Sequence, residues 1–167
     1  YLHVDRPTLF LFDSELVHGS AISFGQILGK IKPASWLLEK MVAISNPILS
    51  QKISNIDFKN PVGLAAGFDY EARLTQILPS LGFGFGTVGT ITQNAYGGNS
   101  RPMLGRLIKS QSLMVNKGFK NLGIHKTLKK LKDMKFKIPI GLSVGVTNTS
   151  ILANQEDAIR DIIETFK

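Results

Sequence analysis

The stretch NPVGLAAGFDYEARL, residues 60–74, decides the fold of this chain. Its apolar run VGLAAG (62–67) is typical of a buried β-strand, and the pattern EARLTQILPSLG (71–82) predicts a helix directly afterwards. A buried strand usually fills a core with large branched side chains, but this one ends on alanine and glycine. The change from strand to helix at Asp69 and Tyr70 predicts a βα unit, and the small residues at the strand end need a reason.

The rest of the chain repeats the same alternation. Further strands are predicted at 85–92 and 138–146, and helices at 121–134 and 154–166. The segment 102–116 interrupts this order and resembles an irregular hairpin, and ISNIDFKNP (53–61) resembles a short strand pair. Strands that alternate with helices predict an α/β fold with a parallel sheet.

The first 50 residues are predicted to be helical and amphipathic. Asp13 or Ser14 can cap a first helix that runs to about Ile31, and a second helix follows over 33–44. The apolar faces of these helices have two explanations. They pack on the domain that follows, or they form a hairpin on a membrane surface, which Trp36 and the basic charge balance favour.

Composition excludes several classes of protein. Of the 167 residues, 43% are hydrophobic and 19% charged, which is typical of a globular chain, and cysteine is absent, which excludes disulfides and thiolate chemistry. No run approaches the roughly 18 apolar residues of a membrane span. The net charge is +8, with many lysines between Lys117 and Lys137. These lysines form a solvated helix face or an RNA-binding patch, and because no interleaved aromatic pattern accompanies them we expect no nucleic acid partner.

In parallel sheets, functional groups collect at the carboxyl ends of the strands. Small residues there let a ligand lie against the backbone, and asparagine amides nearby can both donate and accept hydrogen bonds. Each strand end alone is explained by tight core packing, but several together favour a site for a flat heterocycle. The small residues are Ala65, Ala66, Gly67 and Gly89, the hydroxyl is on Thr90, and the amides are on Asn116 and Asn148.

Other common sites have no support in the sequence. There is no Walker A motif, and the glycines of GFGFGTVG run into a strand rather than open a helix. His3, His18 and His125 are far apart, without carboxylate pairs beside them, so we expect no metal site. No Ser-His-Asp arrangement can be argued.

Five motifs together resemble the dihydroorotate dehydrogenases, in their quinone-linked, membrane-associated branch. They are NPVGLAAGFDY, GFGFGTVGTIT, GNSRPMLGRL, VNKGFKNLG and IPIGLSVGVTNTS, in order and at similar spacing. The resemblance implies an FMN-dependent (β/α)8 TIM barrel, preceded by a small helical head, that oxidises dihydroorotate to orotate in pyrimidine biosynthesis. Electrons then pass to a quinone. The head covers residues 1–50, and residues 51–167 supply about three βα units of the barrel.

The resemblance also assigns roles by position. It implies peripheral association with the cytoplasmic face of the inner membrane, or with the mitochondrial inner membrane in a eukaryote. It assigns no catalytic residue to this chain, because the base, a serine in this branch, is expected outside it. The implied flavin contacts are Ala65, Ala66, Gly67, Tyr70, Gly89, Thr90 and Ser143. The implied substrate contacts are Asn116, Gly118 and Phe119. Leu16, His18 and Phe24 belong to the head, whose helices line the implied entry path of the quinone.

Some positions depart from the family pattern. Tyr70 stands where the family usually has a lysine near flavin and substrate carboxylate, Ser143 replaces an asparagine, and Lys120 replaces another asparagine. Lys117 or Lys120 is a candidate to restore the missing charge. These departures keep two alternatives open: an FMN-barrel oxidoreductase with a changed substrate, and a catalytically silent, membrane-associated binding module.

A complete barrel needs roughly 250 residues, so this chain supplies only part of one. A partial barrel exposes unpaired sheet edges, which reduces solubility. We therefore expect that the remainder of the barrel is supplied as a continuing or second chain.

Overall fold

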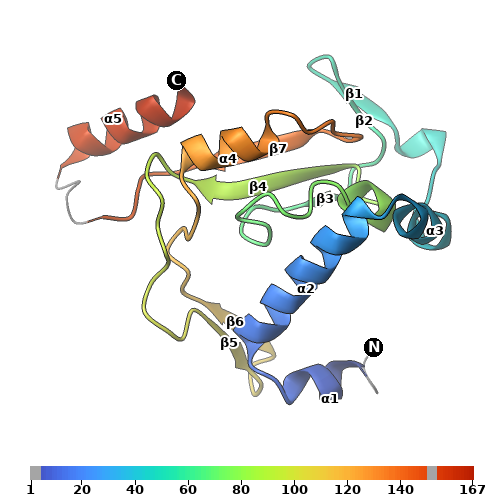
Figure 1. The fold of residues 1–167 in the computed structure, drawn as a ribbon, viewed down its shortest axis with the longest axis horizontal. Coiled ribbons are helices and arrows are strands. Elements are labelled where there is room, and N and C mark those ends of the chain that lie inside the picture. The colour runs from blue at the N-terminus through green and yellow to red at the C-terminus, as the bar shows by residue number, and fades with distance from the viewer. Residues whose placement is uncertain (1–4, 150–153) are drawn as a thin grey trace.

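A three-stranded parallel sheet lies at the centre of the computed structural model, which describes residues 5–149 and 154–167. Its strands are β3 (Gly63–Leu64), β4 (Phe85–Ile91) and β7 (Ile140–Val144), in the order β3-β4-β7. Figure 1 shows β4 as the long central strand of this sheet. The α/β class and the parallel sheet predicted from the alternation are confirmed.

The predicted helix over 71–82 is wrong. The chain forms successive turns there and then a short 3-10 helix, η2 (Leu78–Leu81). The buried Asp69 carboxylate accepts the backbone N–H groups of Arg73 at 2.8 Å and Leu74 at 2.7 Å. Ala72 lies in the left-handed region at φ 54°, which an α-helix cannot contain. The side-chain cap of Asp69 thus bends the chain where the helix was expected.

The strand predicted over 62–67 is also shorter than expected. Only Gly63 and Leu64 pair as a strand, because the chain then turns away through Gly67 at φ 98°. The Gly67 backbone N–H donates to the carbonyl oxygen of Gly89 at 2.7 Å, which keeps this turn against the end of β4.

The later elements match the predicted order. The hairpin of β5 (Leu104–Leu107) and β6 (Ser112–Val115) is antiparallel, and α4 (Ile124–Leu131) connects it to β7. The last helix is α5 (Gln155–Phe166), whose N-terminus is capped by the Asn154 side chain, as predicted. The strands β1 (Gln51–Ile53) and β2 (Ile56–Phe58) form the predicted short pair.

Helices precede the sheet. They are α1 (Asp5–Phe10), α2 (Ser14–Lys30), α3 (Lys32–Val42) and the 3-10 helix η1 (Pro47–Leu49). The Asp13 carboxylate accepts two backbone N–H groups at the start of α2, so the predicted cap is confirmed. The short helix α1 was not predicted. Figure 1 shows α2 running from the β5–β6 hairpin toward α3.

Two hydrophobic clusters hold these layers together. The first joins α2 to the turns after β3 and to the residues before β7, and the second joins β4 to α4. Their buried members are Ile22, Leu74, Ile77, Leu78 and Ile138 in the first, and Ala72, Val88, Ile91 and Ile124 in the second.

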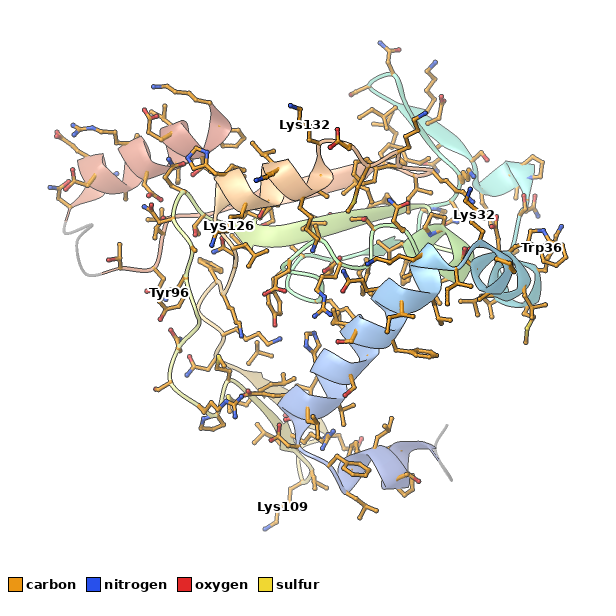
Figure 2. The ribbon with its side chains drawn as sticks, in the orientation of Figure 1. Lys32, Trp36, Tyr96, Lys109, Lys126 and Lys132 are labelled. Carbon is orange, nitrogen blue, oxygen red and sulfur yellow. The ribbon has the colours of Figure 1, made fainter. Side chains whose placement is uncertain are left out.

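Much of the apolar surface of α2 and α3 lies outside these clusters. Phe24 is 63% exposed, Trp36 60% and Met41 73%. Figure 2 shows Trp36 at the outer edge of α3, away from the sheet. Among the residues that the structure describes, no helix combines the length and the hydropathy that a membrane span requires.

Candidate functional site

A cavity of about 390 Å³ lies at the carboxyl ends of β3 and β4, and we call it the strand-end cavity. Residues predicted from several separate segments line it together. From the implied flavin contacts these are Ala66, Gly67, Tyr70, Gly89 and Thr90, and from the implied substrate contacts Asn116, Gly118 and Phe119. The rule that parallel strands present ligands at their carboxyl ends therefore predicts the position of this cavity.

The floor of the strand-end cavity is bare backbone. A Cβ atom added at Gly67 would meet nothing within 4 Å, so the space above this residue is open. Thr90 adds the hydroxyl, and its Oγ1 lies 3.0 Å from Oγ of Ser143. Ser143 thus lies behind Thr90 without lining the cavity, and Ala65 does not line it either.

A network of amides forms one side of the strand-end cavity. The Asn99 side chain donates from Nδ2 to Oδ1 of Asn116 at 2.8 Å, and its own Oδ1 accepts from the Tyr96 hydroxyl at 2.6 Å. Asn148 donates from Nδ2 to the carbonyl oxygen of Gly118 at 3.1 Å. These bonds fix the Asn116 amide so that its NH2 group can donate to a ligand.

Tyr70 lies between two lysines and a histidine. The Nζ atoms of Lys117 and Lys120 lie 4.5 Å and 6.0 Å from the centroid of the Tyr70 ring, which are cation–π distances. The His18 ring stacks against Tyr70 with centroids 6.0 Å apart and planes 13° apart. Lys117 Nζ also lies 3.3 Å from Nδ1 of His18.

A second cavity, of about 900 Å³, lies between α2 and this aromatic and basic group, and we call it the helix cavity. The residues implied for the entry path of the quinone all line the helix cavity, and these are Leu16, His18 and Phe24. Tyr70, Lys117 and Lys120 line both cavities and therefore form the boundary between them.

The contacts of His18 indicate which of its ring nitrogens carries the hydrogen. Its Nε2 lies 3.1 Å from the carbonyl oxygen of Phe68, which can only accept, so Nε2 carries the hydrogen. Nδ1 then offers a lone pair to the Lys117 ammonium. Burial, and next the charge of Lys117, lower the pKa of His18 from its ordinary 6.5, which favours this neutral form.

The pKa values of the two neighbours are also displaced. Burial, and next the charge of Lys120, lower the pKa of Lys117. Burial, and next the charge of Glu71, raise the pKa of Tyr70, so the phenol is neutral at physiological pH.

Sequence reasoning missed part of this site. Asn99 was not singled out, although the glycine pair before it in GGNSRP marks an exposed loop of the kind that carries function. Lys117 and Lys120 were considered as part of the lysine-rich stretch and as substitutes for a missing charge, but not as residues that line a cavity, and both line this one. Their position depends on how the loops after β4 and β6 fold over the sheet.

The fold and the cavity define an α/β protein with a ligand site at the carboxyl edge of a parallel sheet. The family model for dihydroorotate dehydrogenase matches residues 48–167. This chain belongs to the dihydroorotate dehydrogenase family.

Individual relatives agree with this assignment. The chain is 36% identical over 167 residues to a dihydroorotate dehydrogenase (quinone) of Christiangramia forsetii, covering 100% of this chain and 48% of that protein. It is 35% identical over 148 residues to the Rhizobium meliloti protein of the same name, covering 89% of this chain and 39% of the relative. The chain therefore spans about half or less of the length of these relatives.

Solved structures are similar as well. The structure of DHODH from Eimeria tenella in complex with ferulenol matches with a TM-score of 0.64 and 31% identity, over 89% of this chain and 39% of that one. The ligand-free form from the same organism matches with a TM-score of 0.65 and 30% identity, over 90% and 41% of the respective chains.

Proposed function

We propose that this chain forms part of an FMN-dependent dihydroorotate dehydrogenase that oxidises dihydroorotate to orotate in pyrimidine biosynthesis and passes the electrons to a quinone. One observation carries the proposal: most of the residues implied for flavin and all of those implied for substrate, although far apart in the sequence, line one cavity at the strand ends. The relatives named dihydroorotate dehydrogenase (quinone) support the reaction and the acceptor.

The residues present fit a flavin ring. The floor made by Ala66, Gly67 and Gly89 has no bulky side chain, and the space above Gly67 is open, since a Cβ there would meet nothing within 4 Å. These residues and Thr90, with Ser143 behind it, would hold the isoalloxazine against the backbone. When bound, FMN supplies the hydride acceptor of the reaction.

The other side of the cavity would bind the substrate. The oxygen of the Asn116 amide already accepts from Asn99, so its NH2 group is the part that can donate to a carbonyl of a pyrimidine ring. Phe119 and Gly118 line this side of the cavity, where the Phe119 ring can pack against a flat ligand ring. The base that removes the substrate proton is proposed to lie outside this chain, so no residue here is assigned that role.

We propose that the sheet is the first part of a (β/α)8 TIM barrel. Within the described residues, β3 and β7 each pair only with β4, so both outer edges of the sheet are open. Open edges of a parallel sheet favour further pairing. In this proposal residues 51–167 supply the first βα units, residues 1–50 form the head, and the remainder of the barrel comes from a continuing or second chain.

The head is proposed to lie on a membrane. The exposed apolar side chains of α2 and α3, among them Phe24, Trp36 and Met41, suit insertion at the surface of a bilayer. A quinone entering there would reach the helix cavity beside Leu16 and His18. The proposed location is the cytoplasmic face of the inner membrane, or the mitochondrial inner membrane if the organism is eukaryotic.

A second candidate function has one specific observation in its favour. Tyr70 lines the strand-end cavity where the related enzymes usually have a lysine, which favours an FMN-barrel oxidoreductase with a changed substrate. This alternative keeps the flavin site and differs only in what is oxidised.

The test uses the complete protein, purified with its flavin and supplied with dihydroorotate and a soluble quinone. We expect orotate to form in proportion to the quinone reduced. A yellow protein that reduces no quinone with dihydroorotate would favour the changed substrate, and a protein that binds no flavin would contradict both candidates.

A further inference from the structure

Two ammonium groups meet at one aromatic ring in the strand-end cavity. Lys117 and Lys120 both line this cavity and both lie at cation–π distance from Tyr70. Among the described residues, no carboxylate lies within ion-pair distance of either lysine. Glu15 and Glu71 act on Lys117 only from beyond that distance, so within the described residues neither ammonium group has a carboxylate in direct contact.

Two of the acids in this region are already engaged. Glu15 pairs with Arg101 at 3.2 Å and accepts the backbone N–H of Met103 at 2.7 Å. Asp69 accepts two backbone N–H groups in the turn after β3. Neither carboxylate is free to move to the lysines without losing these bonds.

Two like charges in a half-buried cavity repel each other, and burial adds to the cost of their charged forms. The lowered pKa of Lys117, which follows from burial and from Lys120, is consistent with this. An anionic ligand group between the two ammonium groups would remove the repulsion and gain charge-assisted hydrogen bonds.

We propose that Lys117 and Lys120 bind the carboxylate of the ligand in the strand-end cavity, and that the ring of Tyr70 positions both ammonium groups. This inference rests on the proposed function, in which the ligand is orotate or dihydroorotate. The surroundings favour a carboxylate on a flat polar ring, because the Asn116 amide and the Phe119 ring lie in the same cavity.

Tyr70 suits this positioning role because its ring attracts cations while the phenol stays neutral. A carboxylate at position 70 would neutralise the lysines, and a lysine there would add a third positive charge. The face of an aromatic ring holds an ammonium group without competing for the anion. Tyr70 therefore orders the lysines and leaves their charge available.

The test measures orotate affinity by titration of the complete, FMN-loaded protein. We expect Lys117→Met and Lys120→Met each to weaken orotate binding about 10-fold or more, the loss of a hydrogen bond to a charged group. Lys117→Arg should retain most of the affinity, and Tyr70→Phe should retain more than Tyr70→Leu. Lys109→Met is the matched control, because Lys109 lies at the tip of the β5–β6 hairpin, away from the cavity (Figure 2), and we expect it to change nothing.

The outcomes separate the inference from the proposed function. If the unaltered protein binds orotate and both methionine variants bind it equally well, the inference is wrong and the proposed function stands. If the variants lose FMN but retain their orotate affinity per bound flavin, the lysines bind the flavin phosphate and the inference is again wrong. If the unaltered, FMN-loaded protein binds no orotate, the proposed function and this inference fail together.

Discussion

Tyr70 lines both cavities and, with Lys117 and Lys120, forms the boundary between them. Its ring stacks on His18 on the side of α2 and faces Lys117 on the side of the sheet. The structure places two lysines at its ring, Lys117 and Lys120. The two lysines lie far from Tyr70 in the sequence, yet the fold brings their positive charge to its ring.

His18 gives a pH-dependent prediction at the residue scale. The pKa of His18 is lower in the folded protein than its ordinary value of 6.5. Once the pH falls below 6.5, the unfolded chain therefore binds more protons at this residue than the folded chain does. Stability should therefore decrease as the pH falls below 6.5, where a protonated His18 would also face the Lys117 ammonium. We expect His18→Gln to reduce this dependence.

Denaturant unfolding at about pH 7.5 and about pH 5.5 measures this effect. His125→Gln is the control, because His125 is exposed on α4. An equal loss of stability on acidification in the unaltered protein and in His18→Gln would contradict the assignment of His18 as neutral.

Gly118 gives a second prediction. Its φ is 63°, and an added Cβ would overlap Oδ1 of Asn99 and lie 2.8 Å from Nδ2 of Asn148. Gly118→Ala should displace the amides that orient Asn116, and we expect orotate affinity to fall about 10-fold or more. Gly97→Ala is the matched control, because a Cβ there meets nothing within 4 Å. Similar orotate affinity in the two variants would show that the amide network does not position the ligand.

At the scale of elements, the segment after β3 shows why part of the fold could not be predicted. Leu74, Ile77 and Leu78 are buried at a spacing typical of a helix, yet they lie in turns and at the start of a 3-10 helix. Hydrophobic spacing cannot distinguish these arrangements over so short a segment. The deciding interaction is the buried Asp69 cap, which depends on tertiary packing.

Other elements were predictable because local signals agree with their environment. The alternating and apolar pattern of β4, the Asp13 cap of α2 and the Asn154 cap of α5 all reflect local chemistry. The strand-end residues of the site were predictable too, because parallel strands end at one edge. Asn99 and the two lysines were not assigned, because their loops reach the cavity only through long-range folding.

Asp69 also gives a prediction at this scale. Asp69→Asn removes one of the two carboxylate acceptors for the N–H groups of Arg73 and Leu74. Because the site is buried, we expect a loss of about 1–3 kcal/mol in the free energy of unfolding. Asp57→Asn, on the exposed strand β2, is the control. An unchanged unfolding midpoint in Asp69→Asn would show that the cap does not determine the turn.

At the scale of the whole molecule, the open sheet edges and the exposed apolar side chains indicate that isolated copies of this chain associate with one another. Produced on its own, the chain of residues 1–167 should bind hydrophobic dyes and form large, mixed assemblies, because β3 and β7 each have one unpaired edge within the described residues. Light scattering after gel filtration measures this. A monodisperse monomer that binds no dye would contradict the proposal that the sheet needs further strands.

The most direct test of the account as a whole is anaerobic mixing of the complete, FMN-loaded protein with dihydroorotate, followed through the flavin absorbance. We expect that dihydroorotate bleaches the flavin, that orotate forms in equal amount, and that added quinone restores the colour. A flavin that stays oxidised in the presence of saturating dihydroorotate would contradict the proposed function.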